Sequence, residues 1–200
     1  MTNARALALE DIADMRAYER ERDQFRRHII ELKQRRRVSV GDIVTLVFEN
    51  RDPIRFQIQE MARVEKLLSD EAIQVELDVY NPLIPEPGTL SATLFIELTT
   101  KGDLQHWLPR LVGIERSVYL QLADGSRVNA VVDQEHAEQL TREDVTAAVH
   151  YVRFQLSPEQ RTCFGEGPVI LGVDHANYAH SVPLAAPTVT ELLGDLSPDS

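Results

Sequence analysis

Three side chains of the types that bind metals lie close together in residues 174–180. Asp174 and His175 stand at the end of an expected strand, and His180 follows shortly after them. Imidazole and carboxylate groups are the ligands of the two-histidine, one-carboxylate type of metal site. We therefore treat the three residues as candidate ligands of a divalent metal. The same spacing is also typical of a plain turn with exposed histidines, which is the more frequent case.

Glu65, Glu76 and His150 are candidates for acid–base chemistry because each falls among apolar neighbours. Glu65 comes four residues after Met61 and three before Leu68, which places it on the inward stripe of an expected helix. Glu76 has a similar position in the next expected helix, and His150 lies in an apolar strand. A buried ionisable group needs a partner or a shifted pKa. Structural ion pairs and a hydrogen-bonded core histidine are the more frequent explanation.

The sequence motifs of the common enzyme classes are absent. The chain has no HExxH, GxGxxG, GxxxxGK[ST] or GxSxG pattern, which argues against the zinc proteases, nucleotide-binding folds and α/β-hydrolases that these patterns mark. Cys163 is the single cysteine, so the sequence has neither an intrachain disulfide nor a CxxC pair for zinc or an iron–sulfur cluster. The cofactor is therefore unknown, and a divalent metal is the one candidate.

A basic run ends the first expected helix and is a candidate contact for phosphate or RNA. Its members are Arg26, Arg27, Arg35, Arg36 and Arg37. Residues 1–37 contain ten Lys and Arg against seven Asp and Glu, whereas the whole chain has a formal net charge of −11. An acidic body repels nucleic acid, and no aromatic residues alternate with these arginines as they do in single-strand binders. We expect the run to lie on the chain's own acidic body.

Residues 9–36 contain neither Gly nor Pro and predict one long helix with a narrow apolar stripe. The stripe consists of Ile12, Met15, Tyr18, Phe25, Ile29 and Leu32. A polar helix of this kind is stable only when its stripe is covered, either by the chain's own sheet or by a second subunit. We predict that residues 1–37 form an oligomerisation arm and that the protein is a homodimer.

Residues 38–186 predict one α+β core domain. A turn-like entry at 38–42 leads into an apolar, covered strand at 43–48. Two helices are expected next, the first with Asp52 as its N-cap and Pro53 at its first position. The expected boundaries are 53–68 and 69–80 for these helices, and 103–111 for a later short one.

The second half of the chain predicts antiparallel strands. Asp124-Gly125 indicates a hairpin turn. The expected strands are 90–99, 116–122, 127–132, 147–156, 169–174 and 178–184. Short links between consecutive strands favour the α+β class. We expect a mostly antiparallel sheet of about five to seven strands, with the long N-terminal helix and the central helix pair on the sheet. Residues 187–200 predict a short helix and an acidic tail.

The order of several segments resembles a bacterial family catalogued as domain of unknown function 3501. The segments that carry this likeness are Leu9 to Ile12, Lys33 to Val38, Gly41, Phe48 to Arg51, Gln57 to Met61, Arg63, Glu65, Tyr80 to Pro85, Gly88 to Leu98, Val149 to Phe154, Asp174-His175 and Tyr178. Ala176 departs from the family, which has proline there, so the shape of this turn differs from the family pattern. Genes of the family are associated with rubrerythrin-like and iron–sulfur proteins, which implies an accessory role in iron or peroxide handling beside such a partner.

These observations predict a cytoplasmic, partner-binding or accessory protein, because the N-terminal residues lack the apolar core of a secretory signal and no segment approaches the ~20 apolar residues of a membrane span. The first alternative is a metal-binding protein or enzyme. That alternative requires at least three of five side chains to surround one pocket. The five are Glu65, Glu76, His150, Asp174 and His175. The second alternative is RNA binding through the basic run.

Overall fold

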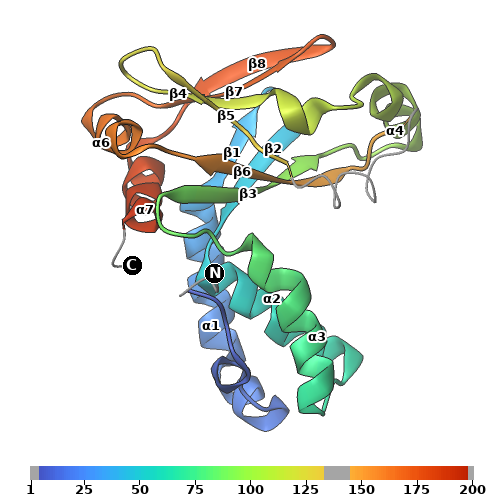
Figure 1. Ribbon diagram of the computed structural model, residues 1–200. Helices are drawn as coiled ribbons and strands as arrows, with labels where there is room; N and C mark the ends of the chain where they lie inside the picture. The colour runs from blue at the N-terminus through green and yellow to red at the C-terminus, as the bar shows by residue number, and fades with distance from the viewer. Residues whose placement is uncertain (1–4, 133–144, 198–200) are drawn as a thin grey trace.

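Two antiparallel sheets of four strands each, with helices around them, make up the fold in the computed structural model, which describes residues 5–132 and 145–197 (Figure 1). Six α-helices occur in this described part of the chain. The expected α+β class is confirmed. The strands form two sheets rather than one, and they number eight in the described residues. Within the same residues no helix is long and apolar enough to pass through a lipid bilayer.

The first sheet has the order β1-β2-β3-β6. Its strands are β1 (Arg37–Val40), β2 (Val44–Glu49), β3 (Thr89–Ile96) and β6 (Val149–Gln155). The expected turn-like entry is in fact strand β1, which pairs with β2 through a hairpin where Gly41 has a φ of 73°. Only glycine adopts this left-handed conformation without strain. The short segment 37–40 was too small for periodicity to reveal it as a strand.

The second sheet has the order β5-β4-β7-β8. Its strands are β4 (Val118–Gln121), β5 (Arg127–Asn129), β7 (Ile170–His175) and β8 (Tyr178–Pro183). The hairpin expected at Asp124-Gly125 is confirmed, since β4 and β5 pair across this turn and Gly125 has a φ of 84°. The two sheets face each other and enclose the main core. Alternate residues of both contribute to it, among them Leu46, Phe48, Leu94, Leu120 and Leu171.

Helices α1 (Met15–Arg36), α2 (Arg51–Glu65) and α3 (Asp70–Tyr80) form an arm that projects from the first sheet (Figure 1). The arm has its own small apolar cluster, separate from the core between the sheets. That cluster contains Leu7, Ile54, Ile58, Leu77 and Ile84. The expected helix pair is present, although the N-cap of its first helix is Asn50 rather than Asp52. Helix α2 packs on α1 and α3 packs on α2, so the pair projects from the sheet instead of lying along it. A single apolar stripe cannot indicate whether a helix will cover a sheet or another helix.

The remaining helices lie around the two sheets. They are α4 (Lys101–Trp107), α6 (Pro158–Glu166) and α7 (Ala186–Leu196), with short 3₁₀ turns at Leu9–Asp11, Asn81–Leu83, Leu108–Arg110 and Ile114–Ser117. Helix α6 lies between the expected strands 147–156 and 169–174, where the sequence predicted no element. Its signal is a capping box between Ser157 and Gln160 with Pro158 at the first position. Helix α7 buries Leu192 and Leu196, and the last residues of the expected tail, 198–200, lie outside the described residues.

Candidate functional site

A cleft of about 210 Å³ lies between the base of the arm and the first sheet. One wall is the sheet face turned away from the core, where Glu49, Thr93 and Tyr151 stand on β2, β3 and β6. The other wall comes from the helices and the turn after α3. The full lining is Lys33, Glu49, Pro53, Ile54, Gln57, Tyr80, Leu83, Thr93, Phe95, Val149 and Tyr151. The cleft therefore combines two charged side chains with aromatic and aliphatic walls.

Glu49 is the most unusual residue of the cleft because its carboxylate is buried and forms no ion pair with the described residues. The residue is 8% exposed, and the Thr93 hydroxyl donates a hydrogen bond of 2.7 Å to its Oε1. Within the described residues no other hydrogen bond and no ion pair reaches this side chain. Burial raises the pKa of the Glu49 carboxyl above its ordinary value, and the Thr93 bond and the charges of Lys33 and Arg36 oppose that rise only in part.

Aromatic rings line the cleft beside Glu49. Tyr151 lies directly opposite Thr93 in the register of β3 and β6, and Tyr80 and Phe95 complete this wall. Burial raises the pKa of the Tyr151 phenol, and the neighbouring Tyr80 and Glu49 raise it further. Tyr151 is therefore a neutral hydrogen-bonding group at neutral pH. A ligand here would meet a carboxylate, phenol groups and flat apolar surfaces together.

A second hollow of about 250 Å³ adjoins the cleft and shares Leu83 and Tyr151 with it. Its other walls are mainly aliphatic, including Val131 and Val132. The Arg153 guanidinium, which also lines it, donates a 2.6 Å hydrogen bond to the carbonyl of Pro82 and so joins β6 to the turn after α3. The two hollows provide a polar compartment next to an apolar one, which is the usual composition of a small-molecule site.

The glutamates selected from the sequence lie on the arm. The expectation that Glu65 is buried was wrong, because α2 ends at this residue and Lys66 adopts the left-handed conformation, which turns the chain away from the inward stripe. Glu76 is half-buried. Burial and, secondarily, the charge of Glu65 raise the pKa of Glu76, which places the two carboxylates near each other. Neither lines the cleft.

His150 is buried in the core, 1% exposed, on the opposite face of β6 from Tyr151. Its Nε2 lies 2.9 Å from both the Thr146 hydroxyl and the Ala147 carbonyl. Burial lowers the pKa of His150, and the buried Glu115 carboxylate, 3.9 Å from Nδ1, opposes this shift. The arrangement is that of a neutral histidine held by its own strand and the preceding turn.

The three metal-ligand candidates are not brought together. Asp174 is exposed, 3.4 Å from the guanidinium of Arg127, whereas His175 Nε2 lies 3.1 Å from the carbonyl of Val112. The ring of His180 lies beside Tyr178. Alternation along β7 directs Asp174 and His175 to opposite faces. Across residues 5–132 and 145–197, no group of three His, Cys, Asp or Glu side chains is placed to hold a metal ion. The five residues of the first alternative therefore do not surround one pocket.

Three of the five arginines in the basic run make ion pairs within the chain. Arg35 pairs with Glu191 at 2.6 Å and Arg37 pairs with Glu97. Arg36 is 1% exposed and binds both carboxylate oxygens of Asp195, at 2.7 and 2.9 Å. Arg26 and Arg27 are exposed on α1. The end of α1 is thus held by the acidic residues of α7 and of the segment after β3, and it does not present a continuous free basic face.

Glu49 and Tyr151 are the residues that the sequence-based selection missed. A signal for Glu49 existed, because it is a charged residue at the end of the otherwise apolar run 43–48. Alternation along β6 places Tyr151 on the face opposite His150. What the sequence lacked was any sign that these two residues and Lys33 line the same cleft.

Comparisons with known proteins give a family and a fold but no activity. A family model described as "Protein of unknown function (DUF3501)" matches residues 6–196. The chain is similar to the crystal structure of a novel protein of unknown function from Burkholderia pseudomallei K96243, with 36% sequence identity and a TM-score of 0.87. The match covers 96% of this chain and 100% of that one. No curated protein matches.

Proposed function

We propose that this chain, which belongs to the DUF3501 family, binds a small zwitterionic molecule in the cleft between the arm and the first sheet. The ligand would carry an ammonium group, a carboxylate and an apolar body, as an apolar amino acid does. Its binding site would consist of Glu49, Lys33 and the aromatic wall.

The observation that carries the proposal is the buried Glu49 carboxylate, which lines a cleft and receives one hydrogen bond, from Thr93. A buried carboxylate without an ion-pair partner lowers the stability of the fold. Carboxylates with a shifted pKa that line clefts are typical of functional sites. An ammonium group beside Glu49 would supply an ion-pair partner and further hydrogen-bond donors.

Lys33 and the apolar walls define the rest of the ligand. Lys33 lines the same cleft and makes no ion pair within the described residues, so a ligand carboxylate would find a cation there. Tyr80, Phe95 and Leu83 offer flat and aliphatic surfaces for an apolar group. A plain amine or a plain acid would satisfy one of the two charges and leave the other unpaired.

Isothermal titration calorimetry of the full chain tests this proposal. The ligands are phenylalanine, its amine analogue phenethylamine and its acid analogue hydrocinnamate, because each analogue lacks one charged group. We expect phenylalanine to bind most tightly. Glu49→Gln should weaken phenylalanine and phenethylamine by about tenfold or more and leave hydrocinnamate unchanged, since a charge-assisted hydrogen bond contributes about 1.5–3 kcal/mol. Lys33→Met should weaken the binding of phenylalanine and hydrocinnamate and leave that of phenethylamine unchanged.

Glu65→Gln is the matched control, since Glu65 is an exposed carboxylate on the same arm that does not line the cleft. It should leave all three affinities unchanged. The proposal is contradicted if the native chain binds none of the three ligands at millimolar concentration. It is also contradicted if Glu49→Gln and Glu65→Gln have equal effects.

A second candidate function is the binding of a protein partner, which we propose from the exposed aliphatic side chains of the arm. Val75 and Val79, one turn apart on α3, are 59% and 52% exposed. Exposed apolar surface of this kind marks interaction sites. We propose a bacterial, cytoplasmic setting for either function. A rubrerythrin-like or iron–sulfur partner, and with it a role in iron or peroxide handling, is proposed from the family resemblance alone.

A further inference from the structure

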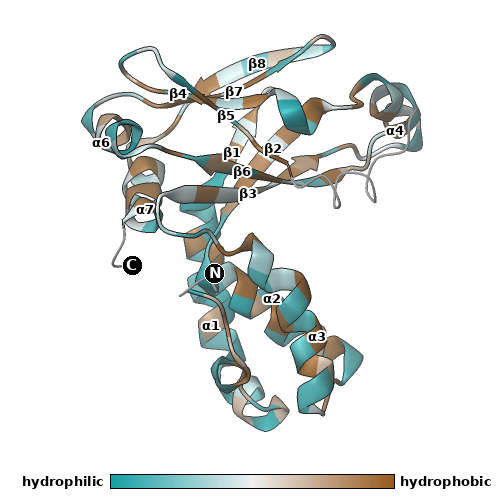
Figure 2. Ribbon diagram, viewed as in Figure 1, coloured by the Kyte–Doolittle hydropathy of each residue, from teal (hydrophilic) through white to brown (hydrophobic). Residues whose placement is uncertain are grey.

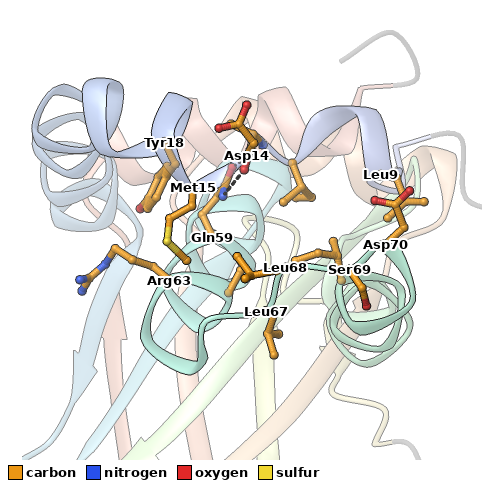
Figure 3. A pocket seen from close by; sticks show the side chains of 14 residues that line it. Leu9, Asp14, Met15, Tyr18, Gln59, Arg63, Leu67, Leu68, Ser69 and Asp70 are labelled. Atoms are coloured by element: carbon orange, nitrogen blue, oxygen red, sulfur yellow. Dashed lines mark hydrogen bonds between the residues drawn. The ribbon is translucent and has the colours of Figure 1, made fainter.

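The free end of the arm carries a pocket of about 190 Å³ on a different surface from the cleft (Figure 3). It lies between the start of α1, the end of α2 and the link to α3. Its apolar lining consists of Leu9, Ile12, Ala13, Met15, Ala62, Leu67, Leu68 and Ile73. Gln59 closes one side, where it exchanges hydrogen bonds with the backbone of Ala13.

Leu68 is both part of this pocket and the most exposed large apolar residue described, at 81%. Its exposure follows from the left-handed Lys66, which ends α2 and directs the link outward. Val64, on the last turn of α2, is 65% exposed. Leu68 is therefore an exposed apolar side chain at the edge of a pocket that combines apolar residues with polar ones such as Asp14 and Ser69. We call Leu68 and this pocket the arm-tip patch.

Charges of opposite sign lie on the two sides of Leu68. Figure 3 shows Arg63 on one side of the pocket and Asp70 on the other, with Leu68 between them. Arg63 is held in place by Glu60, whose Oε2 accepts a 3.1 Å hydrogen bond from Nη2. Asp70 is exposed at the first position of α3. Asp14 also lines the pocket, but the two ends of the patch differ in sign, with a guanidinium on one side of Leu68 and a carboxylate on the other.

A surface with this pattern is complementary to itself. A two-fold rotation about an axis through Leu68 exchanges the two ends, so that Arg63 of each copy faces Asp70 of the other. The same rotation brings Leu68 of each copy against Leu68 of the other, at the edge of both pockets. Interfaces of two-fold dimers have this property, since both copies use the same patch.

We infer that the arm-tip patch is a dimer interface and that its occupant is a second copy of this chain. Charge complementarity between Arg63 and Asp70 and the contact between two exposed Leu68 side chains both favour a second copy over an unrelated protein. The interface lies at the N-terminal end of α1, together with α2 and the start of α3. It is thus more confined than the dimer along the whole first helix that the sequence led us to expect.

Sedimentation equilibrium of the full chain over a range of concentrations tests the inference. We expect the native chain to show a concentration-dependent dimer, and Leu68→Glu to shift it to monomer. Ile30→Glu is the control, because Ile30 is a 48% exposed aliphatic residue on α1, about four turns from the tip. It should leave the dimer unchanged. A native chain that stays monomeric, or a dimer that survives Leu68→Glu, overturns the inference.

Cross-linking gives a second measurement that does not depend on a disruptive substitution. In a Cys163→Ser background, Leu68→Cys should form a disulfide-linked dimer under mild oxidation, because residues on a two-fold axis meet their own copy. Ile30→Cys in the same background should not. Equal cross-linking of the two variants would show random collision and would contradict the interface. A linked species with a mass other than twice that of the chain would indicate a different occupant.

Discussion

Arg36 and Glu49 lie near each other on the side of the first sheet that carries the arm, and both are more than nine-tenths buried. Their surroundings differ. Arg36 binds both oxygens of Asp195 and lies 3.5 Å from Glu191, whereas Glu49 receives one hydroxyl hydrogen bond and lines a cleft. One buried charge forms ion pairs with the same chain, whereas the other forms none within the described residues and is offset only in part by the charges of Lys33 and Arg36.

The difference separates a structural charge from a candidate functional one. The Arg36 pair joins the end of α1 to α7, so it holds the base of the arm against the body of the protein. A buried ion pair with good geometry is strongly destabilising to break, although replacing both partners can be neutral. A buried charge that forms no ion pair, such as Glu49, contributes no such link. Its burial lowers the stability of the fold, and its carboxylate can still accept hydrogen bonds from a ligand.

The largest predicted effect on the free energy of unfolding comes from breaking the Arg36–Asp195 pair. Arg36→Met leaves Asp195 buried without its counter-charge and should lower the free energy of unfolding by about 3–5 kcal/mol. Urea unfolding followed by circular dichroism measures the change. The double variant Arg36→Met, Asp195→Leu should recover most of the loss, because neither charge then remains. A loss below about 1 kcal/mol in the single variant would show that the pair does not hold α1 to α7.

The Glu60 carboxylate of α2 is a second charge that forms ion pairs within the arm. Hydrogen bonds from Arg22, Tyr18 and Arg63 lower the pKa of Glu60 from 4.5 to about 2, although burial opposes the shift. A lowered carboxyl pKa stabilises the folded state above pH 4.5, and this contribution is lost as the pH falls toward 2. Glu60→Gln should therefore lower stability by on the order of 2 kcal/mol at neutral pH.

Thermal unfolding of Glu60→Gln and the native chain across this acid range provides the measurement. The gap between their melting temperatures should close as the pH decreases. Glu65→Gln serves as the control, since Glu65 makes no ion pair within the described residues. A gap that stays constant with pH would mean that the Glu60 charge is not what joins α1 to α2.

The smallest predicted effect is a rise in stability, and it comes from removing the Glu49 charge. Burial raises the pKa of Glu49, so the ionised form costs stability above that pKa and the cost disappears as the pH falls and the carboxyl is protonated. Glu49→Gln should therefore unfold at a slightly higher temperature than the native chain at neutral pH, and the difference should vanish in acid. A lower melting temperature for Glu49→Gln at neutral pH would show that the Glu49 carboxylate stabilises the fold, as the Arg36–Asp195 pair does.

Local sequence patterns predicted most of the elements. The long first helix, the hairpin at Asp124-Gly125 and the alternation in residues 149–155 follow from spacings of two to four residues along the chain. Helix α6 and strand β1 were missed. The first has almost no amphipathic pattern, and the second has four residues. Which sheet or helix each apolar stripe would contact lay beyond these patterns, as the arm shows (Figure 2).

By itself, therefore, the sequence determined the α+β class, the order of most elements and the buried position of His150, because these depend on the periodicity and turn propensities of neighbouring residues. Only the tertiary structure decided which buried ionisable groups form ion pairs and which line a cleft. Arg36 and Asp195 are 159 positions apart, and Lys33, Glu49 and Tyr151 come from three separate segments. The free energy of a buried charge depends on its distance to counter-charges and solvent, and folding alone sets those distances.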